Sequence, residues 1–232
     1  MRLAIIPARG GSKRIPRKNI KLFCGKPMLA WSIEAARSSG CFDRIIVSTD
    51  DAEIAAIAQQ CGAEVPFTRS PALSDDHTGV TAVIAHAIAW MNANGPEQVA
   101  LACCIYATAP FVSATDLRRG LDTLVQENCD YALAVTSFPF PIQRAIRLTA
   151  NRRIEMFSPE YFTTRSQDLE EAWHDAGQFC WGKASAWLTN MPVFAQGASP
   201  VILPRHRVQD IDTPEDWHRA EVMFQLLARE TQ

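Results

Sequence analysis

Short apolar runs alternate with helix-like segments from Arg2 to Ser137, and this alternation constrains the fold more than any other feature of the chain. The runs are continuously apolar, as in Leu3–Ile6, so they suit strands that are covered on both faces. Strands that alternate with helices favour an α/β fold with a doubly wound, mostly parallel sheet of Rossmann-like type. Five strands are predicted, at Arg2–Ile6, Arg44–Ser48, Ala63–Thr68, Val99–Ile105 and Tyr131–Ser137.

The segments between these strands carry helix start and stop signals. Ser, Thr and Asp are favoured capping residues, Pro is favoured in the first turn, and Gly is favoured just after the last turn. Four helices are predicted: Pro27–Ser38, ended by Gly40; Ala52–Gln60, capped by Asp51; a helix from Thr78 to about Met91; and Ala114–Glu127, capped by Ser113.

Composition bounds the class of protein. A chain of 232 residues with 47% hydrophobic residues is most simply one domain, residues 1–232, with a substantial core. No apolar run reaches the roughly 18 residues of a membrane span. The 23 Lys and Arg are outweighed by 25 Asp and Glu, which disfavours a nucleic-acid surface. The seven cysteines lack Cys-x-x-Cys spacing, so reduced thiols and a cytoplasmic chain are expected.

The loop that follows the first predicted strand is glycine-rich and strongly cationic. It reads Pro-Ala-Arg-Gly-Gly-Ser-Lys-Arg-Ile-Pro-Arg-Lys-Asn, and the first acidic residue of the chain is Glu34. Gly10 and Gly11 remove the Cβ atoms that would keep a ligand from the backbone. Backbone N–H groups can then cradle anionic oxygens while Lys and Arg side chains supply full charges. The loop therefore predicts a polyphosphate site.

Other interpretations of this loop are a solvated basic surface or a nucleic-acid-binding arm. The loop is not a Walker loop, because Gly-x4-Gly-Lys-Ser/Thr is absent, and it lacks Gly-x-Gly-x-x-Gly. Solvated basic runs rarely follow a buried strand directly, and the net charge of −2 argues against a nucleic-acid arm.

Asp210 and Asp212 follow the run Val201–Val208, which has strand character. In an extended segment, alternate side chains point to one face, so both carboxylates can reach one hard cation such as Mg²⁺. The alternative is that the pair only marks a turn before a helix capped by Thr213. A polyphosphate loop in the same chain favours the metal site.

The chain resembles the CMP-sugar-acid synthetases, which are cytidylyltransferases that activate nonulosonic acids. The resemblance covers most of the chain and is carried by these segments: Ile5–Leu22, Phe42–Asp50, Arg69 with Pro71, Tyr106–Phe111, Asp175–Gly182 and Gln209–Trp217. The run Tyr-Ala-Thr-Ala-Pro stands where sialic acid synthetases tend to have Gln-Pro-Thr-Ser/Ala-Pro, and it is more similar to the pseudaminic acid branch. The family's fold is that of the nucleotide-diphospho-sugar transferases.

The resemblance implies a role for particular residues. CTP would be held by the loop and by residues around the base: Arg9, Gly10, Gly11, Ser12, Lys13, Lys18, Asn19 and Arg69. Asp210 and Asp212 match the family's Mg²⁺ ligands and, with Arg9, Lys13 and Lys18, would carry catalysis. The sugar acid would meet hydrogen-bonding groups and a stacking face at the predicted strand ends: Tyr106, Thr108, His174, Asp175, Gln178 and Trp181.

The reaction implied is CTP plus pseudaminic acid giving CMP-pseudaminic acid and pyrophosphate, a step of bacterial surface glycan biosynthesis. Alternatives within the family are N-acetylneuraminate, legionaminate or KDO as the acid. A metal-dependent nucleotide-sugar glycosyltransferase shares the topology and an Asp-x-Asp site, but its metal pair usually lies mid-chain. A nucleotide sensor is disfavoured by the paired carboxylates.

From residue 138 to about residue 174 the strand–helix alternation stops. This stretch contains three prolines and scattered aromatic residues, and a structureless loop of such length is improbable in a compact domain. We expect an inserted arm that packs on a second subunit, and the resemblance implies the same homodimer. The alternative is that these aromatic residues fold back on the core of their own chain.

Overall fold

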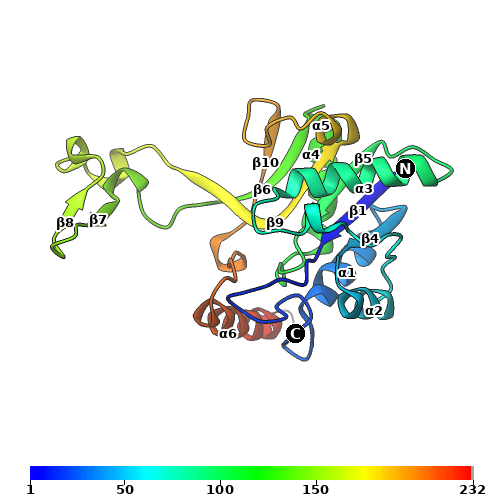
Figure 1. Cartoon of the computed structure of the whole chain (residues 1–232). Helices are drawn as coiled ribbons and strands as arrows, with labels where there is room; N and C mark the ends of the chain where they lie inside the picture. The colour runs from blue at the N-terminus through cyan, green and yellow to red at the C-terminus, as the bar shows by residue number, and fades with distance from the viewer. Residues whose placement is uncertain (231–232) are drawn as a thin grey trace.

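The computed structural model describes residues 1–230, which form a central sheet, covering helices and a projecting arm (Figure 1). The six strands of the sheet lie in the order β10-β6-β9-β5-β1-β4. Their bounds are β1 Arg2–Pro7, β4 Arg44–Ser48, β5 Leu101–Ile105, β6 Tyr131–Ser137, β9 Trp173–Lys183 and β10 Ala198–Ile202. β1 is parallel to β4 and β5, and β6 is parallel to β10. Only β9, antiparallel to β5 and β6, runs the opposite way, so the expected mostly parallel α/β sheet is confirmed.

Helices cover both faces of the sheet. They are α1 Met28–Ser39, α2 Ala52–Gln60, α3 Val80–Asn94, α4 Ala114–Gln126, α5 Ala184–Leu188 and α6 Pro214–Glu230. On one face, Ala4 and Ile6 of β1 share a core with α1, α2 and α4. On the other face, Leu3 and Ile5 share a core with α3 and α5. Because successive strand residues point to opposite faces, the continuous apolar run of β1 is explained by burial on both sides.

A third apolar cluster fastens α6 to the loop that follows β1. Ile15 of this loop and Phe23 of the small hairpin β2 (Leu22–Phe23) and β3 (Lys26–Pro27) pack with Trp217 and Ala220 of α6. Phe23 meets Trp217 edge to face, with ring centroids 5.4 Å apart. The C-terminal helix therefore supports the basic loop rather than the sheet itself.

Two predicted strands differ from the structure. Ala63–Thr68 forms only isolated bridges to the β4 region, at Glu64 and Thr68, because Pro66 between them has no N–H to extend a ladder. The expected strand Val201–Val208 is also wrong: β10 ends at Ile202, and a 3-10 turn at Arg205–Arg207 follows. Further 3-10 turns lie at Pro71–Leu73, Ile142–Arg144, Pro159–Tyr161 and Ser166–Asp168.

The remaining predicted elements agree with the structure. β4, β6 and α2 have the predicted bounds, and the other predicted helices begin and end within a few residues of the observed ones. Asp51 caps α2 by accepting the N–H groups of Glu53 and Ile54, and Ser113 caps α4.

A bulge in β9 shapes the edge of the sheet at which the parallel strands end. The pairing of β6 with β9 jumps from Leu133 opposite Cys180 to Val135 opposite Asp175. Gly177 in this bulge has a φ of +62°, a conformation that is unfavourable for residues with a Cβ. Its N–H donates to Oδ1 of Asp175 at 2.7 Å. Bulges commonly re-aim side chains next to functional sites, and this one fixes Asp175 at the carboxyl edge.

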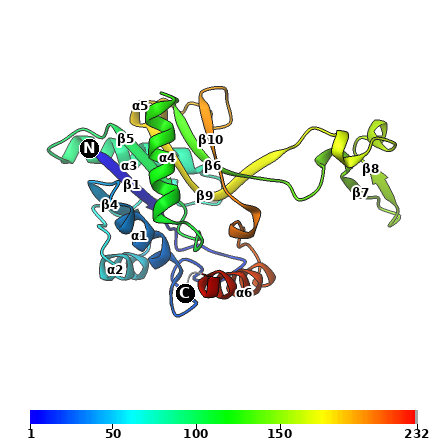
Figure 2. The same cartoon turned by 180° about the vertical axis from the view of Figure 1, so that it is seen from behind.

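The segment predicted as an arm projects far from the sheet in both views (Figures 1 and 2). It leaves after β6, where the N–H of Phe138 donates to the carbonyl of Ala172, and its far end carries the hairpin of β7 (Ile146–Leu148) and β8 (Ile154–Met156). Its large apolar side chains are exposed: Phe138, Phe140, Ile142, Ile146, Leu148, Ile154, Phe157, Tyr161, Phe162 and Trp173. They do not fold back on the core, so that alternative is wrong.

No helix among residues 1–230 is both long enough and apolar enough to cross a membrane. All seven cysteines are free, and four of them are buried.

Candidate active site

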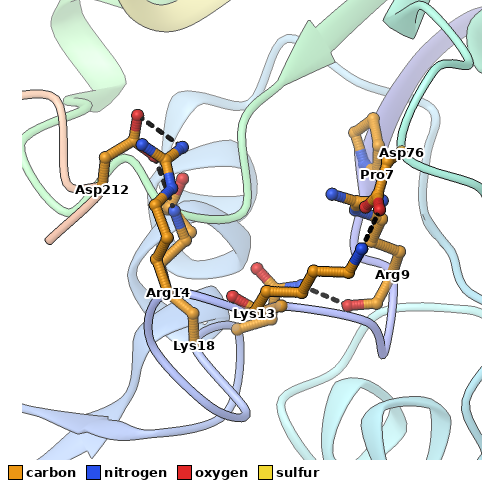
Figure 3. A pocket seen from close by; sticks show the side chains of 10 residues that line it. Pro7, Arg9, Lys13, Arg14, Lys18, Asp76 and Asp212 are labelled. Carbon is orange, nitrogen blue, oxygen red and sulfur yellow. Dashed lines mark hydrogen bonds and ion pairs between the residues drawn. The ribbon is translucent and has the colours of Figure 1, made fainter.

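The basic loop, residues 8–21, begins where β1 ends and borders a cavity of about 430 Å³ that we call the loop cavity (Figure 3). The loop has little regular structure, but its start is fixed because the N–H of Ala8 donates to the carbonyl of Ser48 at 2.9 Å. The cavity is lined by Pro7, Arg9, Ser12, Lys13, Arg14, Lys18, Asn19, Asp76, Thr108 and Asp212. The loop cations that the sequence predicted to act together, Arg9, Lys13 and Lys18, do line one cavity, and Arg14 lines it as well.

The start of α2 anchors the glycine part of the loop. The N–H of Gly10 donates to Oδ1 of Asp50 at 3.0 Å, and a Cβ on Gly10 would lie 2.7 Å from Oδ2 of Asp51. Asp51 in turn pairs with Arg17, and this pairing, together with the cap N–H groups, lowers the pKa of its carboxyl to about 2. Gly10 is thus required by contact with the protein itself, whereas a Cβ on Gly11 would meet open space.

Two polar side chains hold the rest of the loop. Asn19 is buried, and its amide donates to the carbonyl of Arg9 at 2.9 Å. Lys18 donates to the carbonyl of Ile211 at 2.6 Å and lies 3.4 Å from Oδ1 of Asp212. Lys18 therefore joins the basic loop to the segment with the predicted metal-binding aspartates.

Carboxylates of the protein pair with the cations on both sides of the loop cavity (Figure 3). On one side, Asp76 accepts from Arg9 at 2.6 Å and from Lys13, and these cations hold the pKa of Asp76 below its usual range. On the other side, Arg14 lies 2.8 Å from Asp212. Phosphate oxygens that enter this cavity would compete with Asp76 and Asp212. Sequence reasoning missed Asp76, whose only signal was an acidic pair in a distant loop.

Arg69 is a buried cation with unused donors. Its side chain is 3% exposed, it lies 3.7 Å from Asp50, and its Nε and Nη2 make no hydrogen bond. Burial lowers the pKa of Arg69, while the Asp50 carboxylate opposes this effect. Arg69 lines a cavity of about 230 Å³ that shares Pro7, Arg9 and Asp76 with the loop cavity. Buried unpaired donors are costly, so an acceptor on a ligand would be favoured here.

A second large cavity adjoins the loop cavity on the side of β9, and we call it the Tyr106 cavity. Its volume is about 450 Å³, and Thr108 lines both cavities. Its walls are Tyr106, Thr108, His174, Asp175, Ala176, Gly177, Val208, Gln209, Asp210 and Arg219. Four sequence-predicted sugar contacts, at Tyr106, Thr108, His174 and Asp175, are therefore brought together.

Burial and neighbouring negative charge raise the pKa values of two groups that line the Tyr106 cavity. Burial raises the pKa of the Asp175 carboxyl, and the negative charge of Asp210 adds to the increase. Burial likewise raises the pKa of the Tyr106 hydroxyl, so this group stays protonated over the physiological range. His174 donates from Nδ1 to the carbonyl of Asp175 at 2.8 Å, because a carbonyl oxygen can only accept.

Two predicted sugar contacts do not line the Tyr106 cavity. Trp181 is fully buried, stacks on Phe42 with ring centroids 4.8 Å apart, and donates its indole N–H to the carbonyl of Leu117. The expectation that it offers a stacking face to a ligand is wrong. Gln178 is buried as well, and its amide donates to the carbonyl of Arg207 at 2.6 Å. Both lie on β9, where Phe42 and α4 pack on Trp181 and the segment with Arg207 binds Gln178.

Asp210 and Asp212 lie on the walls of adjoining cavities, and Thr108 borders both. Mg²⁺ in nucleotide sites uses one or two protein carboxylates and completes its shell with phosphate oxygens and water. Hard carboxylate oxygens are the donors offered here, so the pair fits that kind of site. Among the described residues, no group of three or more His, Cys, Asp and Glu side chains could hold a metal alone.

Comparisons with known proteins identify the family of this chain. The family model for cytidylyltransferases matches residues 3–180. A pseudaminic acid cytidylyltransferase of Campylobacter jejuni is 44% identical over 224 residues, which cover 97% of this chain and 96% of that protein. A CMP-N,N'-diacetyllegionaminic acid synthase of Legionella pneumophila is 30% identical, with the same coverage of 97% and 96%.

Solved structures share the fold. A CMP:2-keto-3-deoxy-manno-octonic acid synthetase complexed with CTP has a TM-score of 0.69 and 16% identity over 99% of each chain. A 4-diphosphocytidyl-2C-methyl-D-erythritol synthase of Anaerococcus prevotii has a TM-score of 0.60, with 14% identity over 97% of this chain and 98% of that one.

Proposed function

This chain belongs to the cytidylyltransferase family, and we propose that it transfers CMP from CTP to pseudaminic acid and releases pyrophosphate. The observation that carries the proposal is the joining of two cavities at Thr108. One cavity is lined by cations and the other by hydrogen-bonding groups. A triphosphate in the first would present its α-phosphorus to an acceptor in the second.

CTP would occupy the loop cavity and the adjoining Arg69 cavity. Arg9, Lys13 and Lys18 would neutralise phosphate charge, and backbone N–H groups of the basic loop would add hydrogen bonds. The unpaired Nε and Nη2 of Arg69 support a role in binding a base carbonyl, because such an acceptor would satisfy buried donors.

In the reaction, the anomeric hydroxyl of the sugar acid attacks the α-phosphorus. A new O–P bond forms, the bond to pyrophosphate breaks on the opposite side, and the hydroxyl loses its proton. Charge develops on the oxygens around phosphorus and on the departing pyrophosphate. Fixed cations of the loop cavity stabilise that charge, so positioning and electrostatics account for most of the rate enhancement.

Mg²⁺ is the proposed cofactor, and Asp210 and Asp212 are the residues that would hold it. A bound Mg²⁺ supplies a Lewis acid next to the phosphate oxygens. Asp210→Asn and Asp212→Asn should each lower turnover at least about tenfold, since each removes an anionic oxygen ligand. Melting temperatures should stay close to the wild-type value. Full activity of both variants at limiting Mg²⁺ would contradict the metal assignment.

The choice of pseudaminic acid is tested by measuring pyrophosphate release with CTP, Mg²⁺ and one acid at a time. Support comes from 44% identity to a pseudaminic acid enzyme against 30% to a legionaminic acid enzyme. Pseudaminic acid should give the highest kcat/KM among pseudaminate, N-acetylneuraminate, legionaminate and KDO. A higher value for any other acid would reassign the acceptor.

We also propose that the arm holds a homodimer together. Phe140, Leu148 and Phe162 are each more than two-thirds exposed, and several large exposed apolar side chains on one projecting segment mark an interaction site. Light scattering should give the mass of a dimer at micromolar concentrations. A variant with Ser at these three positions should be a monomer with an unchanged circular dichroism spectrum. A monomeric wild-type protein would contradict the proposal.

A further inference from the structure

We infer that Arg219 of α6 binds the carboxylate of the acceptor acid; this inference rests on the proposed function and adds a substrate-binding residue to it. Arg219 is one of the residues that line the Tyr106 cavity. It lies in the second turn of α6, and the sequence analysis predicted no function for it.

Charge balance in the Tyr106 cavity is the first reason. The acceptor is an anion at neutral pH, yet two carboxylates, Asp175 and Asp210, lie on the walls that it must approach. Among the residues that line this cavity, all within the described chain, Arg219 is the only Lys or Arg. The proposed Mg²⁺ would offset the charge of Asp210, but Asp175 would still repel an entering carboxylate, and Arg219 is the side chain of this cavity that can pair with it through a guanidinium.

The guanidinium of Arg219 is also uncommitted. Within residues 1–230 it takes part in no ion pair or side-chain hydrogen bond, in contrast to Arg9 and Arg14, which are paired with carboxylates. Its charge helps to lower the pKa of Asp216 on α6, but Oδ2 of Asp216 already accepts from the N–H groups of Asp212 and Thr213. The five donors of Arg219 are therefore available to a ligand.

The position of Arg219 suits the chemistry of a sugar acid. In such acids the carboxylate is attached to the anomeric carbon that carries the attacking hydroxyl. A guanidinium fork binds a carboxylate through two parallel hydrogen bonds, which fixes both the distance and the plane of the group. Binding of the carboxylate from α6 would therefore fix the neighbouring hydroxyl close to the loop cavity, which Thr108 also lines.

The first turn of the same helix is tied to one of the predicted metal ligands. The hydroxyl of Thr213 accepts the N–H of Asp216, and Oδ2 of Asp216 accepts the N–H groups of Asp212 and Thr213, so the backbone of Asp212 is fastened to the helix that carries Arg219. The orientation of the acceptor and the position of Asp212 would in this way depend on the same helix, and productive alignment requires both to be held together.

The test compares Arg219→Gln and Arg219→Lys with Arg229→Gln, a matched control at the last turn of the same helix. Each variant is assayed with pseudaminic acid and with its uncharged carboxamide. Arg219→Gln should lower kcat/KM for the acid about ten- to hundredfold, as expected for loss of a charged hydrogen-bonded pair. The preference of the wild-type enzyme for the acid over the amide should shrink by a similar factor. A change in the acid-to-amide ratio is not expected from a structural defect.

The other readouts separate this role from alternatives. KM for CTP, the dissociation constant for CTP and the melting temperature should stay at wild-type values in all three variants. Arg219→Lys should retain part of the acid preference because it keeps the charge but lacks the fork. An unchanged acid-to-amide ratio in Arg219→Gln, or an effect confined to CTP, would overturn the inference alone. If the wild-type enzyme uses no nonulosonic acid with CTP, the proposed function and this inference fall together.

Discussion

Replacement of Asp51 by Ala tests how the basic loop is anchored to the fold. Oδ1 of Asp51 accepts the N–H groups of Glu53 and Ile54, each at 3.0 Å, and also Nη2 of Arg17 at 3.0 Å. Loss of the helix cap costs about 1 kcal/mol. The pair with Arg17 is partly exposed, so its loss adds only about 0.2–1 kcal/mol.

The expected destabilisation of Asp51→Ala is therefore about 1–2 kcal/mol, or roughly 2–8 °C in melting temperature for a chain of this size. Asp51→Asn keeps a capping oxygen and should lose less than half as much. Asp122→Ala, at an exposed position of α4, is the control and should melt with the wild type. The measurement is thermal unfolding followed by circular dichroism.

The same variants give a signature in pH. The pKa of Asp51 is lowered from 3.8 to about 2 in the folded protein, chiefly by the Arg17 hydrogen bond. A carboxyl with a depressed folded pKa stabilises the protein fully above its unfolded pKa and loses this contribution as the pH falls through the folded value. The melting difference between wild type and Asp51→Asn should thus be constant above about pH 4 and shrink below it. A difference that grew on acidification, or an unchanged Tm in Asp51→Ala, would refute the reasoning.

Three further outcomes are expected. Asp76→Asn should lower the dissociation constant of CTP about two- to tenfold, because phosphate would no longer compete with a carboxylate for Arg9 and Lys13. The constant is measured by titration calorimetry. Weaker binding of CTP would mean that Asp76 positions these two cations instead. Lys18→Ala should lower kcat/KM for CTP while melting changes little, and unchanged CTP kinetics would remove Lys18 from the site. Gly182→Ala should lower the free energy of unfolding in urea by about 1–3 kcal/mol, since a Cβ there would lie 2.5 Å from the indole nitrogen of buried Trp187. An unchanged free energy of unfolding would show that the core rearranges to accept the methyl group.

Strands β1, β4, β5 and β6 of the sheet were predictable because their signals are local. β4, β6 and α2 are bounded by residues that act on their own backbone, such as the cap Asp51. The cationic wall of the loop cavity was predictable for a related reason: it follows one strand directly, and the carboxyl end of a strand in such sheets is where ligands bind.

Other features depend on partners far away in the sequence. Trp181 looks like a ligand contact by residue type, but it is buried by contacts with Phe42 and Leu117, which are both distant in the sequence. Asp76 pairs with Arg9 although 67 positions separate them in the sequence, and no local sequence pattern at either residue predicts this contact. Arg219 stands in an ordinary amphipathic helix, and only the packing of α6 brings it to the Tyr106 cavity.

Strand β9 begins at Trp173, where the arm joins the sheet, and reaches Asp175 two residues later. One uninterrupted stretch of backbone therefore leads from the surface proposed to join two subunits into the cavity proposed for the acceptor. The nucleotide side has no such connection, because its loop is fastened to α2 and α6. If the arm joins two subunits as proposed, loosening that contact should impair use of the acid before it impairs use of CTP, because β9 belongs to both the arm junction and the acceptor cavity.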